Sequence, residues 1–171
     1  MKIRRASIDD LAALVQLEKQ FPTDRLSRAS FRHLLRHGHA AILVCECSGS
    51  FAGNAVVFYR RGNARARLYS LIVDPDFQRR GIARALLAAA ESDAAARGHG
   101  AMYLEVRPDN APAIRCYQQY GYAMTQRVEN FYEDGTDALR MQKCLVMKKE
   151  NLNAASPRQA ASVPGAPGPT T

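Results

Sequence analysis

One stretch, residues 73–87, constrains the fold of this chain more than any other, because it joins a strand pattern to a helix pattern through a basic loop that contains glycine. The apolar, β-rich run 68–73 ends in a turn at residues 74–76. After Gly81 the sequence becomes rich in alanine and leucine, which favours a helix to about residue 97. This order predicts a strand, a basic loop and a helix start in immediate succession.

A basic loop that leads into a helix is suited to binding an anion. The first turn of a helix has backbone N–H groups without intrahelical partners, and the helix dipole adds positive charge there. Gly81 has no Cβ, so a phosphate can approach the backbone closely. Arg79, Arg80 and Arg84 add forked donors that match phosphate oxygens. The loop therefore predicts a phosphate site, and the alternative is an ordinary strand–helix connection with solvated arginines.

The hexapeptide Gln-Arg-Arg-Gly-Ile-Ala at residues 78–83 resembles the Gln/Arg-x-x-Gly-x-Gly/Ala signature of the GNAT superfamily of acetyl-CoA-dependent N-acetyltransferases. The Val-Asp-Pro at residues 73–75 matches as well, and the position between a strand and a helix strengthens the match. The resemblance implies that oxyanion-stabilising backbone N–H groups lie around Ile72 and Val73 and that the loop holds the pyrophosphate. The implied cofactor-binding residues on this side are Leu71, Ile72, Val73, Gln78, Arg79, Arg80, Gly81, Ile82, Ala83 and Arg84.

Length and composition fit a single globular domain. The chain has 171 residues, of which 47% are apolar and 23% charged. We expect the domain to cover residues 1–149, and we expect residues 150–171, which are rich in Ala, Pro and Gly, to be disordered because they can bury little apolar surface. No apolar run approaches the roughly 20 residues that span a bilayer, and the first residues lack the apolar region of a secretory signal. These features favour a cytoplasmic protein without a membrane partner.

The charge and the potential metal ligands narrow the partners. A net charge of +8 attracts anions in general, but no zinc-finger, homeodomain or aromatic-interleaved RNA motif is present, so direct reading of nucleic acid is not expected. Cys45 and Cys47 lack a second Cys/His pair at zinc spacing, and His33 and His37 lack an acidic or thiolate companion, so no metal is expected. The four cysteines are expected to be reduced, structural thiols.

Hydrophobic periodicity and turn residues predict eleven elements along the chain. Ser7 and Ser27 read as N-caps of the first two helices, and Gly38 as the left-handed residue that ends the second. The predicted order is strand 2–6, helices 8–20 and 27–37, strands 40–47, 51–60 and 67–73, helix 82–97, strand 102–106, helix 110–120, and strands 122–128 and 138–147. This β-α-α-β-β-β-α-β-α-β-β order is an α/β (α+β) mixed sheet flanked by helices, and it is similar to the GNAT (acyl-CoA N-acyltransferase) fold throughout.

Residues 103–122 and 131–141 resemble the RimI branch of the superfamily, which comprises bacterial N-terminal acetyltransferases that act on ribosomal-protein alanine. The resemblance implies that Glu105 is the general base that deprotonates the amine, directly or through water, and that Tyr117 is the general acid for the departing thiolate. It also implies that Asn110 and Tyr117 contact the cofactor.

The same three residues have structural alternatives. Glu105 can be a strand-end carboxylate paired with Arg107 or another arginine, and Tyr117 can be a core tyrosine beside Ile114. Asn110 can simply cap a helix. In favour of the catalytic interpretation of Tyr117, a phenol with a pKa near 10 stays protonated at pH 7, which is the state that a general acid requires.

The sequence thus predicts an enzyme that transfers acetyl from acetyl-CoA to a primary amine, with a protein or peptide N-terminal α-amine as the leading acceptor. An α-amine with a pKa of about 8 is unprotonated at pH 7 far more often than a lysine with a pKa of about 10.4. The alternatives are a small-molecule or polyamine acceptor, attracted by the acids of loop 129–137, and a non-catalytic CoA-binding module whose basic surface faces the ribosome or nucleic acid. The chain has no tryptophan, which the branch usually carries in the region matching residues 21–38, so the acceptor stays open, and a monomer and a homodimer both fit.

Overall fold

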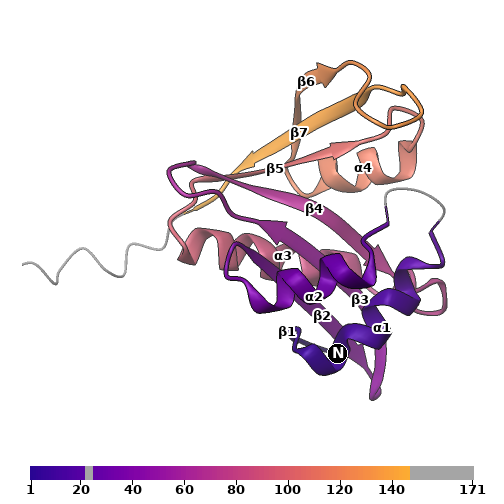
Figure 1. Ribbon diagram of the computed structural model, residues 1–171. Coiled ribbons are helices and arrows are strands. Elements are labelled where there is room, and N and C mark those ends of the chain that lie inside the picture. The colour runs from indigo at the N-terminus through magenta and orange to yellow at the C-terminus, as the bar shows by residue number, and fades with distance from the viewer. Residues whose placement is uncertain (22–24, 147–171) are drawn as a thin grey trace, which may run out of the picture.

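The computed structural model describes residues 1–21 and 25–146, which form one mixed sheet of seven strands with helices on both faces (Figure 1). The expected disordered tail and the end of the last predicted strand lie outside the described residues. The strands are β1 (Lys2–Arg5), β2 (Ala40–Cys47), β3 (Ser50–Phe58), β4 (Arg65–Val73), β5 (Ala101–Val106), β6 (Ala123–Val128) and β7 (Ala138–Cys144). The helices are η1 (Ile8–Asp10), α1 (Leu11–Glu18), α2 (Arg28–Arg36), η2 (Pro75–Phe77), α3 (Ile82–Ala96) and α4 (Ala111–Gln119). The predicted order of elements is confirmed.

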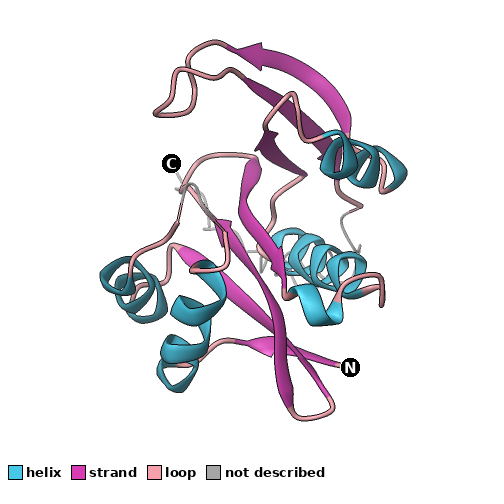
Figure 2. Ribbon diagram, turned by 90° about the vertical axis from the view of Figure 1, so that its right-hand side faces the viewer, coloured by secondary structure: helices cyan, strands magenta, loops and turns pink. Residues whose placement is uncertain are grey.

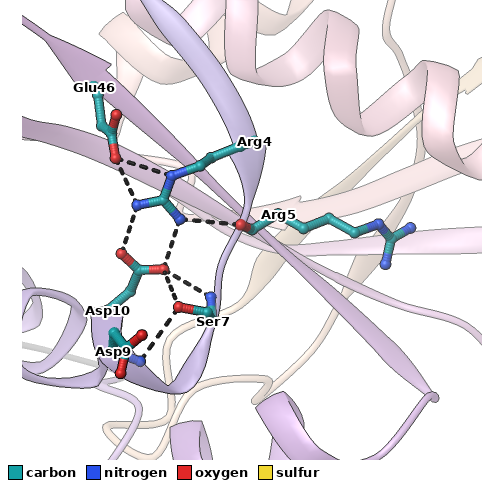
Figure 3. A network of polar contacts seen from close by, with 6 residues as sticks. All are labelled: Arg4, Arg5, Ser7, Asp9, Asp10 and Glu46. Carbon is teal, nitrogen blue, oxygen red and sulfur yellow. Dashed lines mark hydrogen bonds and ion pairs between the residues drawn. The ribbon is translucent and has the colours of Figure 1, made fainter.

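The first helical turn is fixed by a capping network around Asp10 (Figure 3). The Ser7 side chain accepts a hydrogen bond from a backbone N–H, and the Ser7 backbone N–H donates in return to Asp10 at 2.7 Å, which forms a capping box. Arg4 donates to both oxygens of Asp10 at 2.8 Å and to Glu46 on β2 at 2.9 and 2.5 Å. The Arg4 guanidinium lowers the pKa of Asp10. The network ties the start of the helical layer to the β1–β2 edge of the sheet.

The end of α2 agrees with the prediction in position, because Gly38 is the C′ residue after the C-cap His37, but it differs in backbone conformation. Gly38 was expected in the left-handed conformation, but it is absent from the residues with positive φ, and His37 is the C-cap with extended backbone at φ −117° and ψ 134°. The reason is local: His37 itself caps the last turn, and residues 38–39 form the turn that leads into β2. Its backbone N–H donates to the carbonyl of His33, and its Nδ1 lies 2.8 Å from the same oxygen.

The strands lie in the order β1-β2-β3-β4-β5-β7-β6, and the sheet that they form has a hydrophobic layer on each face. On one face α1 and α2 pack against β2 and β3 around Leu14, Phe31 and Val56. On the other face α3 packs against the strands around Leu86, with α4 residues at the margin of the same core. Figure 2 shows β1–β4 with α1–α3 in the lower part of the molecule and β5–β7 with α4 in the upper part.

The two parts of the sheet meet at β4 and β5, whose pairing is parallel and short. It covers only the three positions from Arg65↔Ala101 to Arg67↔Tyr103, although β4 continues to Val73 and β5 to Val106. Beyond this seam the two strands diverge. A bulge in β4 lies just past the seam, where the partners of Leu68 and Ser70 on β3 are adjacent residues. The residues of β4 that pack on the α3-side core therefore change from even positions, Ala66 and Leu68, to odd positions, Leu71 and Val73, while Tyr69 packs on the α1–α2 side.

Candidate active site

A cavity of about 460 Å³ lies where β4 and β5 diverge. Its walls come from β4, from the end of β5, from α4, from the end of α1 and from the β6–β7 loop. Among the predicted site residues, the cavity brings together Leu71, Ile72, Glu105, Asn110 and Tyr117. Residues from β4, β5 and α4, which are distant in the sequence, therefore face one space because the sheet opens at this point.

Glu105 reaches this cavity through the alternation of β5. Met102, Leu104 and Val106 are buried in the core beneath α3, so the intervening Tyr103 and Glu105 point to the opposite face. The Glu105 side chain is only 4% exposed. The strand thus presents a nearly dry carboxylate to the cavity.

Two arginines hold the Glu105 carboxylate. Arg67 on β4 donates to Oε2 at 2.9 Å, and Arg140 on β7 donates to Oε1 from Nε at 3.0 Å and from Nη2 at 2.9 Å. An ionised carboxylate has about four lone-pair sites, so these three bonds leave about one on Oε2. Arg107, the partner considered from the sequence, instead donates to Asp134 at 2.8 Å and lies over the Tyr132 ring. The carboxylate is paired with arginine, as the structural alternative supposed, but through different arginines.

Tyr117 and Asn110 reach the cavity from α4. The Asn110 side chain accepts from the Ala113 backbone N–H at 3.2 Å, so Asn110 caps the helix, and a proline follows in the first turn. Tyr117 is half-buried, with its ring 5.8 Å from that of Tyr122 in an edge-on arrangement. Burial raises the pKa of Tyr117 well above its usual value, so the phenol keeps its proton at neutral pH.

The basic loop has the geometry of an anion site, beyond the residues that line the cavity. Gly81 is the N-cap of α3 with φ 77°, and Arg79 before it also has positive φ, at 60°. No side chain caps the helix, and Ala85 donates to the Gly81 carbonyl at 3.0 Å, so the N–H groups of the preceding turn have no helical acceptor. Arg80 packs over the Phe77 ring and donates to the Asp76 carbonyl at 3.1 Å.

The predicted cofactor residues around the start of α3 differ in their exposure to solvent. Residues 78–81 and Arg84 are exposed, whereas Ile82 is buried and anchors the helix in the core. Val73 also packs against this core, and Ala83 is half-buried. The predicted cofactor residues therefore form two groups: one lines the cavity, and the other surrounds the start of α3.

The prediction missed three charged residues that shape the cavity: Arg67, Arg140 and Glu18. Arg67 and Arg140 come to Glu105 through strand pairing between distant segments, and single-sequence patterns do not give that register. Glu18 left a signal, because it follows Leu14 by four residues and Leu11 by seven and so lies on the buried face of α1. A carboxylate on an apolar helix stripe is a candidate for a functional role.

Two further findings concern the described ranges 1–21 and 25–146. They contain no group of three or more His, Cys, Asp or Glu side chains that could hold a metal ion. None of their helices combines the length and the apolar character needed to cross a membrane. The four cysteines are free thiols, and Cys45 is buried.

Comparison with known proteins gives a consistent picture. The acetyltransferase (GNAT) family profile matches residues 8–122. A [ribosomal protein bS18]-alanine N-acetyltransferase of Escherichia coli K12 is 40% identical over 67 residues, which cover 39% of this chain and 45% of that protein. An acetyltransferase of Pectobacterium atrosepticum is 34% identical over 127 residues, 71% of this chain and 87% of the relative.

The fold comparison extends over most of the chain. The crystal structure of the ribosomal-protein-S18-alanine N-acetyltransferase from Escherichia coli superposes with a TM-score of 0.74 at 30% identity, covering 88% of this chain and 97% of that one. The sequence match to the curated Escherichia coli relative, by contrast, spans less than half of that protein's length.

Proposed function

The chain belongs to the acetyltransferase (GNAT) family, and from this premise we propose that it transfers the acetyl group of acetyl-CoA to the N-terminal α-amine of a protein or peptide. The observation that carries the proposal is the cavity where β4 and β5 diverge, which is lined by a nearly dry carboxylate, a protonated phenol and the open edge of β4. Acetyl transfer from a thioester needs groups of these kinds around one space.

Each group has a proposed role in the reaction. The remaining lone pair of Glu105 accepts the amine proton, directly or through a water molecule. Backbone N–H groups around Ile72 and Val73 stabilise the oxyanion at the attacked carbonyl. When the new C–N bond forms and the C–S bond breaks, Tyr117 donates its phenolic proton to the leaving thiolate. Asn110 is proposed to contact the cofactor beside Tyr117.

The basic loop is proposed to bind the pyrophosphate of the cofactor. The exposed guanidinium groups of Arg79, Arg80 and Arg84, together with Gln78, surround the first turn of α3, where Gly81, Ile82 and Ala83 supply backbone N–H groups. Leu71, Ile72 and Val73 connect this loop to the cavity, so a cofactor bound along β4 would reach from the loop to Tyr117. This arrangement assigns the cofactor to the β4–α3 side and leaves the α1 side to the acceptor.

An α-amine suits this cavity better than a lysine side chain. Glu105 already accepts three hydrogen bonds from guanidinium groups, which leaves little capacity for a strongly basic amine. An α-amine with a pKa of about 8 needs less help to lose its proton than a lysine with a pKa of about 10.4. A relative that matches part of the chain is named for acetylation of a ribosomal-protein alanine, which supports the same class of acceptor.

A screen of acceptors tests the proposal. Acetyl-CoA turnover is measured with peptides that begin with alanine, serine or methionine, with N-terminally blocked lysine peptides, and with polyamines. We expect the highest kcat/KM with an unblocked peptide. A preference for polyamines would favour the second candidate, a small-amine acetyltransferase, for which the Glu133 carboxylate at the cavity is the specific observation. Absence of turnover with all three classes would contradict the proposal.

Two wider properties belong to the same proposal. We propose that residues 1–149 form the catalytic domain, and that it acts in the cytoplasm. The described part of this range contains the whole sheet and the cavity. Activity retained by a chain shortened after residue 149 would support this assignment of the domain.

A further inference from the structure

Glu18, the last residue of α1, is a buried carboxylate that the proposed chemistry does not use. The residue is 4% exposed and lines the same cavity as Glu105 and Tyr117. Its Oε2 accepts a hydrogen bond from the Leu26 backbone N–H at 3.3 Å. Its Oε1 is buried and has no hydrogen-bond partner within the part of the chain that the structure describes. A charged side chain thus lies at the cavity wall with one oxygen unsatisfied.

An unsatisfied carboxylate oxygen is costly, because burial removes the hydration of the group without replacing it. Burial raises the pKa of Glu18, and the hydrogen bond from Leu26 and the nearby Arg25 offset this only in part. Protonation lessens the cost but still leaves a polar oxygen without a partner. A cation that donated a hydrogen bond to Oε1 would remove both the unpaired charge and the missing bond.

We propose that Glu18 recognises the acceptor: its side chain turns so that the buried Oε1 faces the cavity and accepts a hydrogen bond from the ammonium group of the amine substrate. This inference rests on the proposed function, which it deepens by naming the residue that selects a free amine. Glu18 lies on the helical side of the cavity, whereas the three bonds to Glu105 come from β4 and β7. Glu105 thus keeps about one free lone pair for the proton transfer, whereas Glu18 has a whole oxygen without a partner.

Glu18 also distinguishes a free N-terminus from a blocked one. A free α-amine carries positive charge at pH 7 and has several N–H donors, whereas an acetylated N-terminus is neutral and has one. An unpaired buried carboxylate favours the first over the second through both charge and hydrogen bonding. The product of the reaction would therefore lose its main attraction to this wall and be released.

Calorimetric titration with two peptides tests the inference without requiring turnover. A peptide that begins with alanine is titrated into the CoA-bound protein in its free-amine form and in its N-acetylated form. We expect the wild-type protein to bind the free-amine peptide about tenfold more tightly or better, which corresponds to about 1.4 kcal/mol. Glu18→Gln keeps the size of the side chain and an acceptor for Leu26, and it should lose this preference while binding the acetylated peptide unchanged.

Glu129→Gln is the matched control, because it removes the same charge from an exposed position in the β6–β7 loop. It should keep the preference for the free amine. In the acetylation assay, Glu18→Gln should raise KM for the acceptor about tenfold or more with kcat changed far less, which is the pattern for loss of ground-state binding. Its melting temperature should equal or exceed that of the wild type, because the substitution removes an unpaired buried charge.

The inference and the proposed function can fail separately. Equal affinity of the wild-type protein for the two peptides, or a preference that Glu18→Gln retains, would overturn the role of Glu18 even if acetyl transfer to peptides is observed. Absence of acetyl transfer in the acceptor screen would overturn the proposed function, whatever the titrations show.

Discussion

The two walls of the cavity each carry a buried carboxylate, and the two carboxylates differ in how many hydrogen bonds they accept. On the sheet wall, Glu105 is enclosed by Arg67 and Arg140, with three hydrogen bonds between 2.9 and 3.0 Å. On the helical wall, Glu18 has one bond to a backbone N–H and one oxygen without a partner. The two side chains are similarly inaccessible to solvent, so burial alone does not distinguish them.

The difference lies in how each carboxylate contributes to stability. Removing one member of a buried ion pair leaves the other charge uncompensated and destabilises a protein, whereas removing an unpaired charge does not. Glu105 therefore supports the fold as well as any chemistry, because it joins β4, β5 and β7 across the sheet. Glu18 has no such pair of guanidinium partners, so we expect it to contribute less to the fold than Glu105 does. Four substitutions test this contrast, in order of decreasing expected effect.

Glu105→Gln tests whether the paired carboxylate also carries chemistry. We expect turnover to fall by roughly 10²–10⁴, the usual range for a lost general base, with little change in CoA affinity. The loss should shrink as pH rises towards the pKa of the amine, because the acceptor then deprotonates without help. The free energy of unfolding should fall by about 1–3 kcal/mol, since two partly exposed arginines lose a charged partner. Full turnover at neutral pH would return Glu105 to a purely structural role.

Tyr117→Phe tests the phenol that lines the same cavity as both carboxylates. Removing the hydroxyl should lower turnover by about 10²-fold, because the leaving thiolate loses its proton donor. High pH should not restore activity, in contrast to Glu105→Gln, and peptide binding should change little. pH–rate profiles of the two variants measure the difference. Recovery of Tyr117→Phe at alkaline pH would contradict the assignment of a general acid.

Asp10→Asn tests whether pairing predicts stability at a carboxylate far from the cavity. Asp10 is buried like Glu105 and is bound by Arg4 through two 2.8 Å bonds (Figure 3). We expect chemical denaturation at pH 7 to show a loss of about 2 kcal/mol. The pKa of Asp10 is lowered from its usual 3.8, so the wild-type advantage exists above that value and disappears as pH falls through the lower folded value. Asp9→Asn, at an exposed neighbour, is the control and should cost far less.

Gly81→Val tests whether the loop before α3 binds CoA, and we expect this binding to be independent of Glu18 and Glu105. A β-branched residue is strained at φ 77°, although the structure leaves open space where its Cβ would lie. The strained loop should bind CoA about tenfold more weakly in calorimetry. Gly62→Val, which has φ 72° and equally open space in the β3–β4 turn, controls for strain alone and should keep CoA affinity. Unchanged affinity in a folded Gly81→Val protein would exclude the loop as the phosphate site.

The sequence predicted the elements well because their signals are local. Ser27 and Asn110 occupy their expected N-caps, and Gly81 begins α3 in the left-handed conformation that the loop requires. The cavity could be predicted only in part. Glu105 and Tyr117 were singled out by resemblance, but the two arginines on Glu105 depend on strand register and the unpaired state of Glu18 depends on three-dimensional packing. Hydrogen-bond satisfaction is a property of the folded chain as a whole, and short-range patterns do not contain it.

The three-position seam between β4 and β5 has a mechanical consequence for the sheet. Sheets resist bending because neighbouring strands share hydrogen bonds along their whole length, and here that sharing stops at Arg67 and Tyr103. The remaining lengths of the two strands form a fork, closed at the seam and backed by the common core under α3. A molecule bound between the two strands would contact both of them and bridge the gap where they share no hydrogen bonds. We therefore expect a bound molecule to stiffen the middle of this protein, and we expect that stiffness to be lost when the molecule departs.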